Sequence, residues 1–174
     1  MSIVPDTKDW TWVLQRACPE CGFDTRQVTK EEVPRVLREN AAEWGKILAA
    51  EPTRLALRPS PSRWSTLEYA CHVRDVFVKF DQRLALMLSE EGPQFLNWDQ
   101  DATAVAERYN EQVPAEVSAQ LQGAALALAA RFAAVQPGQW QRSGQRSDGA
   151  RFTVETLGRY MVHDPVHHLY DVRE

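Results

Sequence analysis

The sequence is poor in the residues that mark several common kinds of functional site. It contains three cysteines and four histidines in 174 residues. Because three is an odd number, the cysteines do not suit the paired framework of a disulfide-rich domain. A glycine-rich phosphate loop is absent, and so are the GxSxG and HExxH motifs. The sequence therefore gives no sign of a nucleotide-binding loop, a serine hydrolase elbow or a zinc peptidase helix.

Positive charge and long apolar runs are also scarce. The formal net charge is -4, and lysines and arginines do not cluster, which argues against a nucleic-acid-binding surface. No stretch approaches the roughly 18 consecutive apolar residues that a membrane-spanning helix needs. The first residues lack the basic and apolar regions of a signal peptide. We therefore expect a cytoplasmic protein that acts on a small molecule, with a homodimer as the default assembly.

Helical periodicity and helix-start signals dominate the rest of the chain. Thr-x-x-Glu and Ser-x-x-Glu patterns begin at Thr29 and Ser65, Pro114 suits a first helical position, and Thr153 suits an N-cap. The helices expected from these signals cover residues 30–50, 66–89, 115–135 and 154–174, with a shorter piece over 101–112. No strand pattern is persuasive, and residues 136–151 suit a long loop or a hairpin. The prediction is an all-α fold, an antiparallel four-helix bundle over residues 29–174 after an irregular segment over residues 1–28.

Three of the four histidines fall in one short run, HDPVHH, over residues 163–168. On a helix, His163 and His167 lie one turn apart on the same side, whereas His168 points elsewhere. His72 on the helix over 66–89 is the candidate third member. Three imidazoles form a metal site with open coordination positions. The alternative is that each histidine is an exposed or hydrogen-bonded side chain without a ligand. Asp164 is either a carboxylate that orients an imidazole or a solvated charge on the helix face.

Two motifs carry a resemblance to a known family. The run WSTLEYACHVRDV over residues 64–76 and the pair His163-x-x-x-His167 resemble the second-helix and last-helix motifs of the DinB-like superfamily. This superfamily includes the N-terminal domain of mycothiol-dependent maleylpyruvate isomerases and the bacillithiol transferases. The resemblance implies a bundle that binds a divalent metal, often zinc or nickel, through His72, His163 and His167. It also implies frequent dimers.

The resemblance favours one function and leaves a second open. Members with an assigned reaction use the metal to activate the thiol of a small cofactor such as mycothiol or bacillithiol. We accordingly expect a metal-dependent thiol transferase, in which Arg159, Tyr160 or Tyr170 contacts the substrate. The alternative is a non-catalytic bundle whose metal site is structural, empty or vestigial and whose CxxC segment serves a partner or a regulatory role.

A separate cysteine motif lies in the irregular N-terminal segment. Cys18 and Cys21 have the CxxC-Gly spacing of half a zinc site, and no second CxxC follows. The pair is therefore two reduced thiols, half of a second metal site completed by outside ligands, or a redox pair. Cys71 suits a small buried apolar side chain.

Overall fold

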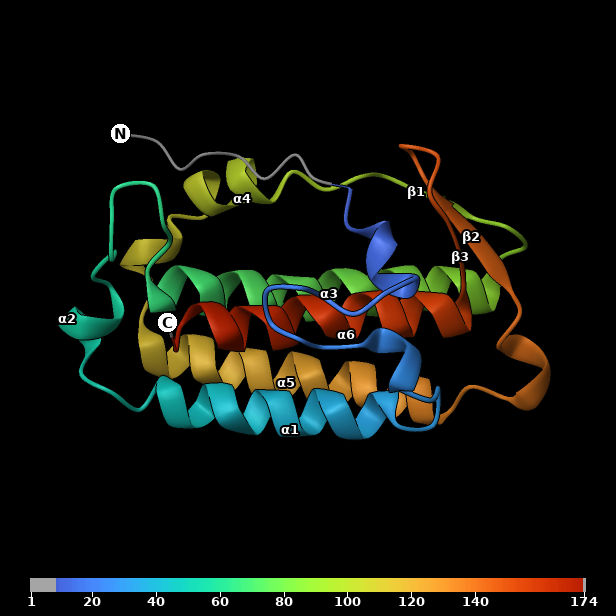
Figure 1. Ribbon diagram of the computed structural model, residues 1–174, viewed down its shortest axis with the longest axis horizontal. Coiled ribbons are helices and arrows are strands. Elements are labelled where there is room, and N and C mark those ends of the chain that lie inside the picture. The colour runs from blue at the N-terminus through green and yellow to red at the C-terminus, as the bar shows by residue number, and fades with distance from the viewer. Residues whose placement is uncertain (1–8, 174) are drawn as a thin grey trace.

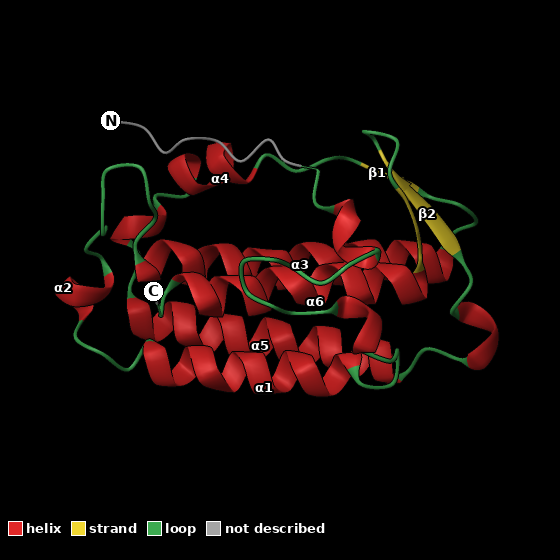
Figure 2. Ribbon diagram, in the orientation of Figure 1, coloured by secondary structure: helices red, strands yellow, loops and turns green. Residues whose placement is uncertain are grey.

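The computed structural model describes residues 9–173, so residues 1–8 of the predicted irregular segment and residue 174 lie outside the described residues. Four long helices lie side by side and form the body of the molecule (Figures 1 and 2). They are α1 (Val33–Ile47), α3 (Thr66–Ser89), α5 (Pro114–Ala133) and α6 (Val154–Asp171). The predicted four-helix bundle is confirmed.

The order of the helices in space differs from their order in the chain. Helix α5 packs against both α1 and α3, and α6 also packs against both of them. The colour gradient in Figure 1 shows that α3 and α5 run in the same direction, opposite to α1 and α6. This arrangement arises because the chain between α3 and α5 crosses back along the whole bundle. The crossover places residues 94–111 over one side of the bundle, next to α3.

Two of the predicted helix starts have the expected side-chain caps. Ser65 accepts a hydrogen bond from the Glu68 amide, and the Glu68 carboxylate accepts one from the Ser65 amide at 2.8 Å, which completes a capping box. Thr153 caps α6 in the same way. At Thr29, by contrast, the amide and the hydroxyl both donate to the Glu32 carboxylate, and α1 begins only after Glu32. The expected helix start there is therefore wrong by one turn.

The bundle core is apolar and closely packed. Trp44 on α1, Phe77 on α3 and Phe132 on α5 are among its largest fully buried side chains. Cys71 lies in the same core with no exposed surface, as expected for a small apolar side chain. None of the helices in residues 9–173 combines the length and the apolar character that a membrane span needs.

Shorter elements cover the two ends and one side of the bundle. They are α2 (Pro52–Leu55), β1 (Gln94–Phe95), α4 (Gln100–Ala106), η3 (Tyr109–Glu111), η4 (Pro137–Gln139), β2 (Ser143–Arg146) and β3 (Arg151–Thr153). The strands form one sheet in the order β1-β2-β3, with β1 parallel and β3 antiparallel to β2. Of the two alternatives for residues 136–151, the hairpin is correct. The expectation of no strands is wrong, because strands of two to four residues are too short to show alternation.

The N-terminal segment lies on α6 and is held there by specific contacts. Its two 3₁₀ turns, η1 (Thr11–Leu14) and η2 (Thr25–Gln27), both pack against α6. The Thr25 hydroxyl donates to the Val13 carbonyl at 2.5 Å, which ties the two turns to each other. Arg159 on α6 donates to the Val28 carbonyl at 3.1 Å. These contacts place Cys18 and Cys21 beside the histidines of α6.

Candidate metal centres

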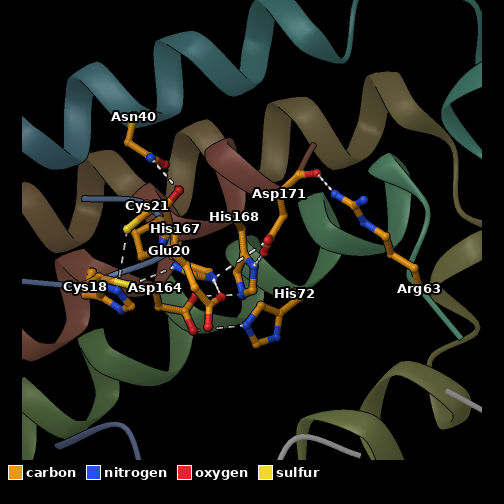
Figure 3. Close-up of polar contacts among 12 residues, drawn as sticks. Cys18, Glu20, Cys21, Asn40, Arg63, His72, Asp164, His167, His168 and Asp171 are labelled. Carbon is orange, nitrogen blue, oxygen red and sulfur yellow. Dashed lines mark hydrogen bonds and ion pairs between the residues drawn. The ribbon is translucent and has the colours of Figure 1, made fainter. Parts of the chain in front are cut away.

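Helix α6 carries two pairs of metal-ligand residues, displaced from each other by a single residue. His163 and His167 form one i,i+4 pair, and Asp164 and His168 form the other. Successive helical residues point about 100° apart, so the two pairs occupy adjacent stripes of the helix. Figure 3 shows His167 beside the N-terminal segment, and Asp164 and His168 on the side of His72. His163 lies with His167 beside the N-terminal segment.

The second stripe and α3 form the first group of donor atoms, which we call the His72 centre: His72, Asp164 and His168. The Nε2 atom of His72 lies 3.3 Å from the Asp164 Oδ2 atom, and the Nε2 atom of His168 lies 3.7 Å from Asp164 Oδ1. One donor atom of each residue lies within 4.8 Å of the other two. The three side chains therefore converge on one point.

The surroundings of the His72 centre suit a bound cation. Nδ1 of His168 lies 2.7 Å from a carboxylate oxygen of Asp171, an arrangement that orients a ligating imidazole and leaves its Nε2 atom for the metal. Oδ1 of Asp164 is buried and accepts no hydrogen bond from any described residue. Burial acts to raise the pKa of Asp164, but the imidazoles of His72 and His168 outweigh it and hold that pKa below its usual range. Two imidazoles and one carboxylate form a donor set typical of divalent transition metals with open positions.

The first stripe and the CxxC segment form the second group, which we call the Cys18 cluster: Cys18, Cys21, His163 and His167. Sγ of Cys18 lies 3.6 Å from His167 Nδ1, and Sγ of Cys21 lies 3.8 Å from His163 Nε2. All four donor atoms lie within 4.8 Å of one another. The ring of Trp10 packs against both imidazoles, with centroid separations of 5.4 Å.

Burial shifts the pKa values of Cys21, His163 and His167 in the Cys18 cluster. It raises the pKa of the Cys21 thiol to about 11. It lowers the pKa of His163 to about 4, and the neighbouring His167 imidazole adds to that shift. The pKa of His167 is also lowered, again mainly by burial. Both imidazoles are therefore neutral at pH 7, as ligation requires.

The structure does not bring together the ligand set predicted from the sequence. His72, His163 and His167 are divided between the two groups, with His163 and His167 beside the cysteines. His168, which was expected to point elsewhere, lies with His72, and Asp164 joins them as a donor. The reason is the helical register, because a shift of one residue exchanges one i,i+4 pair for the other.

An open pocket of 590 Å³ borders both groups, because His163 and His167 of the Cys18 cluster also line it. Asp164 and His168 are part of its wall, whereas His72 itself has no exposed surface. The indole of Trp98, also in the wall, stacks on His72 with a centroid separation of 5.3 Å and an interplanar angle of 5°. The donor set therefore has one side packed in protein and one side facing the pocket.

Of the three residues predicted to contact the substrate, only one lies in the wall of the pocket. Tyr160 lines the pocket, but Arg159 and Tyr170 do not. Arg159 is used to hold the N-terminal segment, through the Val28 carbonyl and an ion pair with Glu155 at 2.9 Å. Tyr170 is 37% exposed and comes after the part of α6 that lines the pocket.

Arg83, a pocket residue on the same helix as His72, is not among the residues predicted from the sequence. It follows His72 by eleven residues, three helical turns, and so projects from nearly the same side of α3. Arg83 is only 5% exposed, and burial lowers its pKa to about 10, with a contribution from the positive charge of Arg146. Its Nη2 atom donates to the Leu96 carbonyl at 3.0 Å. Its spacing from His72 was the one signal that could have revealed it.

Arg83 also differs from its neighbour Arg146 in how its charge is balanced. Arg146 forms an ion pair with Asp148 at 2.8 Å. Arg83 has no ion pair within residues 9–173; instead its guanidinium lies over the rings of Phe80 and Phe95, 5.0 Å from each centroid. A buried cation without a carboxylate partner is a suitable contact for an anionic group on a ligand.

Comparison with known proteins agrees with the fold. The family model described as the DinB superfamily matches residues 37–172. The chain belongs to the DinB superfamily. A similar solved structure is described as "YfiT from Bacillus subtilis is a probable metal-dependent hydrolase with an unusual four-helix bundle topology". It is 22% identical, with a TM-score of 0.73, and the match covers 82% of this chain and 85% of that one. The comparison with curated proteins gives no match.

The orienting role of Asp171 gives a prediction for this DinB protein. The Asp171→Asn variant should bind a divalent metal at the His72 centre roughly 10–100-fold more weakly, because the Nδ1 atom of His168 loses its carboxylate partner. Competition with a chelating indicator measures the affinity. The matched control is Asp81→Asn, which removes a carboxylate that pairs with Arg131 away from both groups. Equal affinities for the two variants would contradict the orienting role.

Proposed function

We propose that this protein is a metal-dependent transferase that joins a low-molecular-weight thiol, such as mycothiol or bacillithiol, to a small electrophile. In this proposal His72, Asp164 and His168 hold a divalent ion, with zinc or nickel the leading candidates. The observation that carries the proposal is the pocket of 590 Å³ on the open side of this donor set. A volume of this size is within the range of small-molecule sites and has room for a thiol cofactor beside a second substrate.

The chemistry requires a nucleophile that is ionised at neutral pH. A divalent ion on these three residues supplies this, because coordination deprotonates a thiol and lowers the pKa of water. Other side chains near the donor set orient a ligand, exclude solvent and supply positive charge. The Asp171 carboxylate holds His168 in the required orientation, Trp98 shields His72 from solvent, and Arg83 offers a positive charge to an anionic group of the thiol or of the electrophile.

Monochlorobimane is a suitable probe electrophile because its reaction with a thiol is simple to follow. The thiol sulfur forms a bond to carbon, the carbon–chlorine bond breaks, chloride leaves with the electron pair, and the thiol proton passes to the buffer. The experiment compares turnover by the metal-free protein with turnover after zinc or nickel is restored, using mycothiol, bacillithiol and glutathione in turn. A chromogenic ester is assayed in parallel. We expect metal-dependent conjugation with one of the thiols.

The other outcomes decide between the remaining functions. Metal-dependent ester hydrolysis without thiol conjugation would replace the transferase with a hydrolase, as the description of YfiT suggests for that protein. Metal binding with neither activity would favour a non-catalytic bundle. In the His72→Ala variant the conjugation should disappear together with the metal of the His72 centre. Persistence of both would contradict the assignment of these ligands.

A further inference from the structure

The CxxC motif of the N-terminal segment is not used by the proposed reaction. We propose that the Cys18 cluster is a second metal site, a closed tetrahedral Zn²⁺ site formed by Cys18, Cys21, His163 and His167. Its role is to fix the N-terminal segment to α6. Two thiolates and two imidazoles are a common ligand set for structural zinc.

The separations between the donor atoms fit a tetrahedron around zinc. Zinc–sulfur bonds of about 2.3 Å and zinc–nitrogen bonds of about 2.0–2.1 Å place sulfur and nitrogen ligands roughly 3.6 Å apart. The Cys18–His167 and Cys21–His163 separations are 3.6 and 3.8 Å. The remaining pairs lie within 4.8 Å. The four side chains thus surround one point without rearrangement of the backbone.

The backbone of the loop that carries Cys18 and Cys21 positions both thiols for binding one metal ion. The Gly22 amide donates to the Cys18 carbonyl and the Cys18 amide donates to the Phe23 carbonyl, both at 2.9 Å. Gly22 has φ +74°, a left-handed conformation that glycine adopts without strain. The resulting tight turn presents both Sγ atoms to the same side, toward α6.

The groups around the four donors support a metal site whose coordination is closed by its four protein ligands, although His163 and His167 also border the pocket. The Nε2 atom of His167 faces carboxylate oxygens of Glu20 at 3.5 Å and Asp171 at 3.7 Å, so its Nδ1 atom is the one turned toward Cys18. A carboxylate behind a ligating imidazole is the usual arrangement at zinc sites. Cys18 is 1% exposed, and the ring of Trp10 packs over both imidazoles. Four protein ligands leave no position for a substrate.

The His72 centre and the Cys18 cluster differ in one property that separates them experimentally. Only the Cys18 cluster contains sulfur donors. Cobalt(II) bound by thiolates gives a near-ultraviolet charge-transfer band, and nitrogen and oxygen donors alone do not give it. Titration of the metal-free full-length protein with Co²⁺ therefore reports on the Cys18 cluster whether or not the proposed reaction is correct. We expect the band to grow to one equivalent of thiolate-bound cobalt per chain, and Zn²⁺ to abolish it.

Three variants test whether Cys18 and Cys21 are the thiolate ligands of the Cys18 cluster. Cys18→Ser should lose the band and one equivalent of zinc per chain. Cys21→His keeps four ligands with one thiolate, so the band should fall to about half its intensity while the zinc is retained. Cys71→Ala is the matched control, because Cys71 lies in the core beside the Tyr109 carbonyl and contributes to neither group. Its band should equal that of the unmodified protein.

The proposal is overturned if the unmodified protein shows no thiolate charge-transfer band at any cobalt ratio. It is also overturned if the band is lost in Cys71→Ala but kept in Cys18→Ser. The Cys21→His variant guards against the case in which Cys18→Ser fails to fold, since it preserves a complete ligand set. A band at full intensity in Cys21→His would exclude Cys21 as a ligand.

Discussion

The His168→Ala variant should lose metal binding at the His72 centre and metal-dependent conjugation by at least ~100-fold. Removal of a residue that only orients a ligand costs about 10–100-fold in affinity or activity, so loss of a ligand costs at least as much. His168 also contacts His72, with ring centroids 5.0 Å apart. Chelator competition measures the metal affinity, and the monochlorobimane assay measures turnover.

The same variant distinguishes the ligand set of the structure from the one expected from the sequence. If His72, His163 and His167 shared an ion, His168→Ala would keep its metal and His163→Ala would lose it. We expect the reverse at the His72 centre. The thiolate–cobalt band serves as the internal control, because His168→Ala should leave the Cys18 cluster intact. A parallel loss of the band would indicate a general loss of structure.

The Arg83→Met variant should discriminate between anionic and neutral electrophiles. Loss of the buried guanidinium should lower kcat/KM for a carboxylate-bearing electrophile about 30-fold, which corresponds to about 2 kcal/mol. For a neutral electrophile of the same size, kcat/KM should change less than about threefold, because the chemistry at the His72 centre is unaffected. Initial rates for the two electrophiles at low concentration measure this ratio.

The Arg83→Met variant should also keep nearly the same free energy of unfolding as the unmodified protein. Methionine removes a buried cation that has no ion pair in the described part of the chain, and it retains most of the apolar stem over Phe80 and Phe95. The free energy of unfolding should therefore stay within about 1 kcal/mol of its original value. Arg131→Met, which breaks the half-exposed ion pair with Asp81, is the control for loss of one positive charge. An equal drop in kcat/KM for both electrophiles would contradict the anion-binding role.

The helices could be predicted because their signals are local. Ser65 and Glu68 form the expected capping box, and Thr153 caps the last helix, since a cap depends on residues three positions apart. The path of the crossover between α3 and α5 is not local. It depends on contacts such as the hydrogen bond from Arg83 to the Leu96 carbonyl, which no periodicity reveals.

The metal groups could be predicted only in part, for a geometrical reason. Sequence spacing identified the CxxC pair, the last-helix histidines and His72 as metal-ligand residues. It could not decide whether α3 meets the stripe of His163 or the stripe of Asp164, because a helix rotation of about 100° separates them. Nor could it show that the N-terminal segment folds back on α6. That contact occupies His163 and His167 and leaves Asp164 and His168 for His72.

The most direct test of the two-centre account is the number of metal ions per chain, counted by native mass spectrometry on the zinc-loaded protein. We expect two ions in the unmodified chain, one in His168→Ala and one in Cys18→Ser. The ion left in His168→Ala should coincide with a retained thiolate–cobalt band, and the ion left in Cys18→Ser should not. A single ion in the unmodified chain that is missing from both variants would contradict the account, because it would mean one shared site.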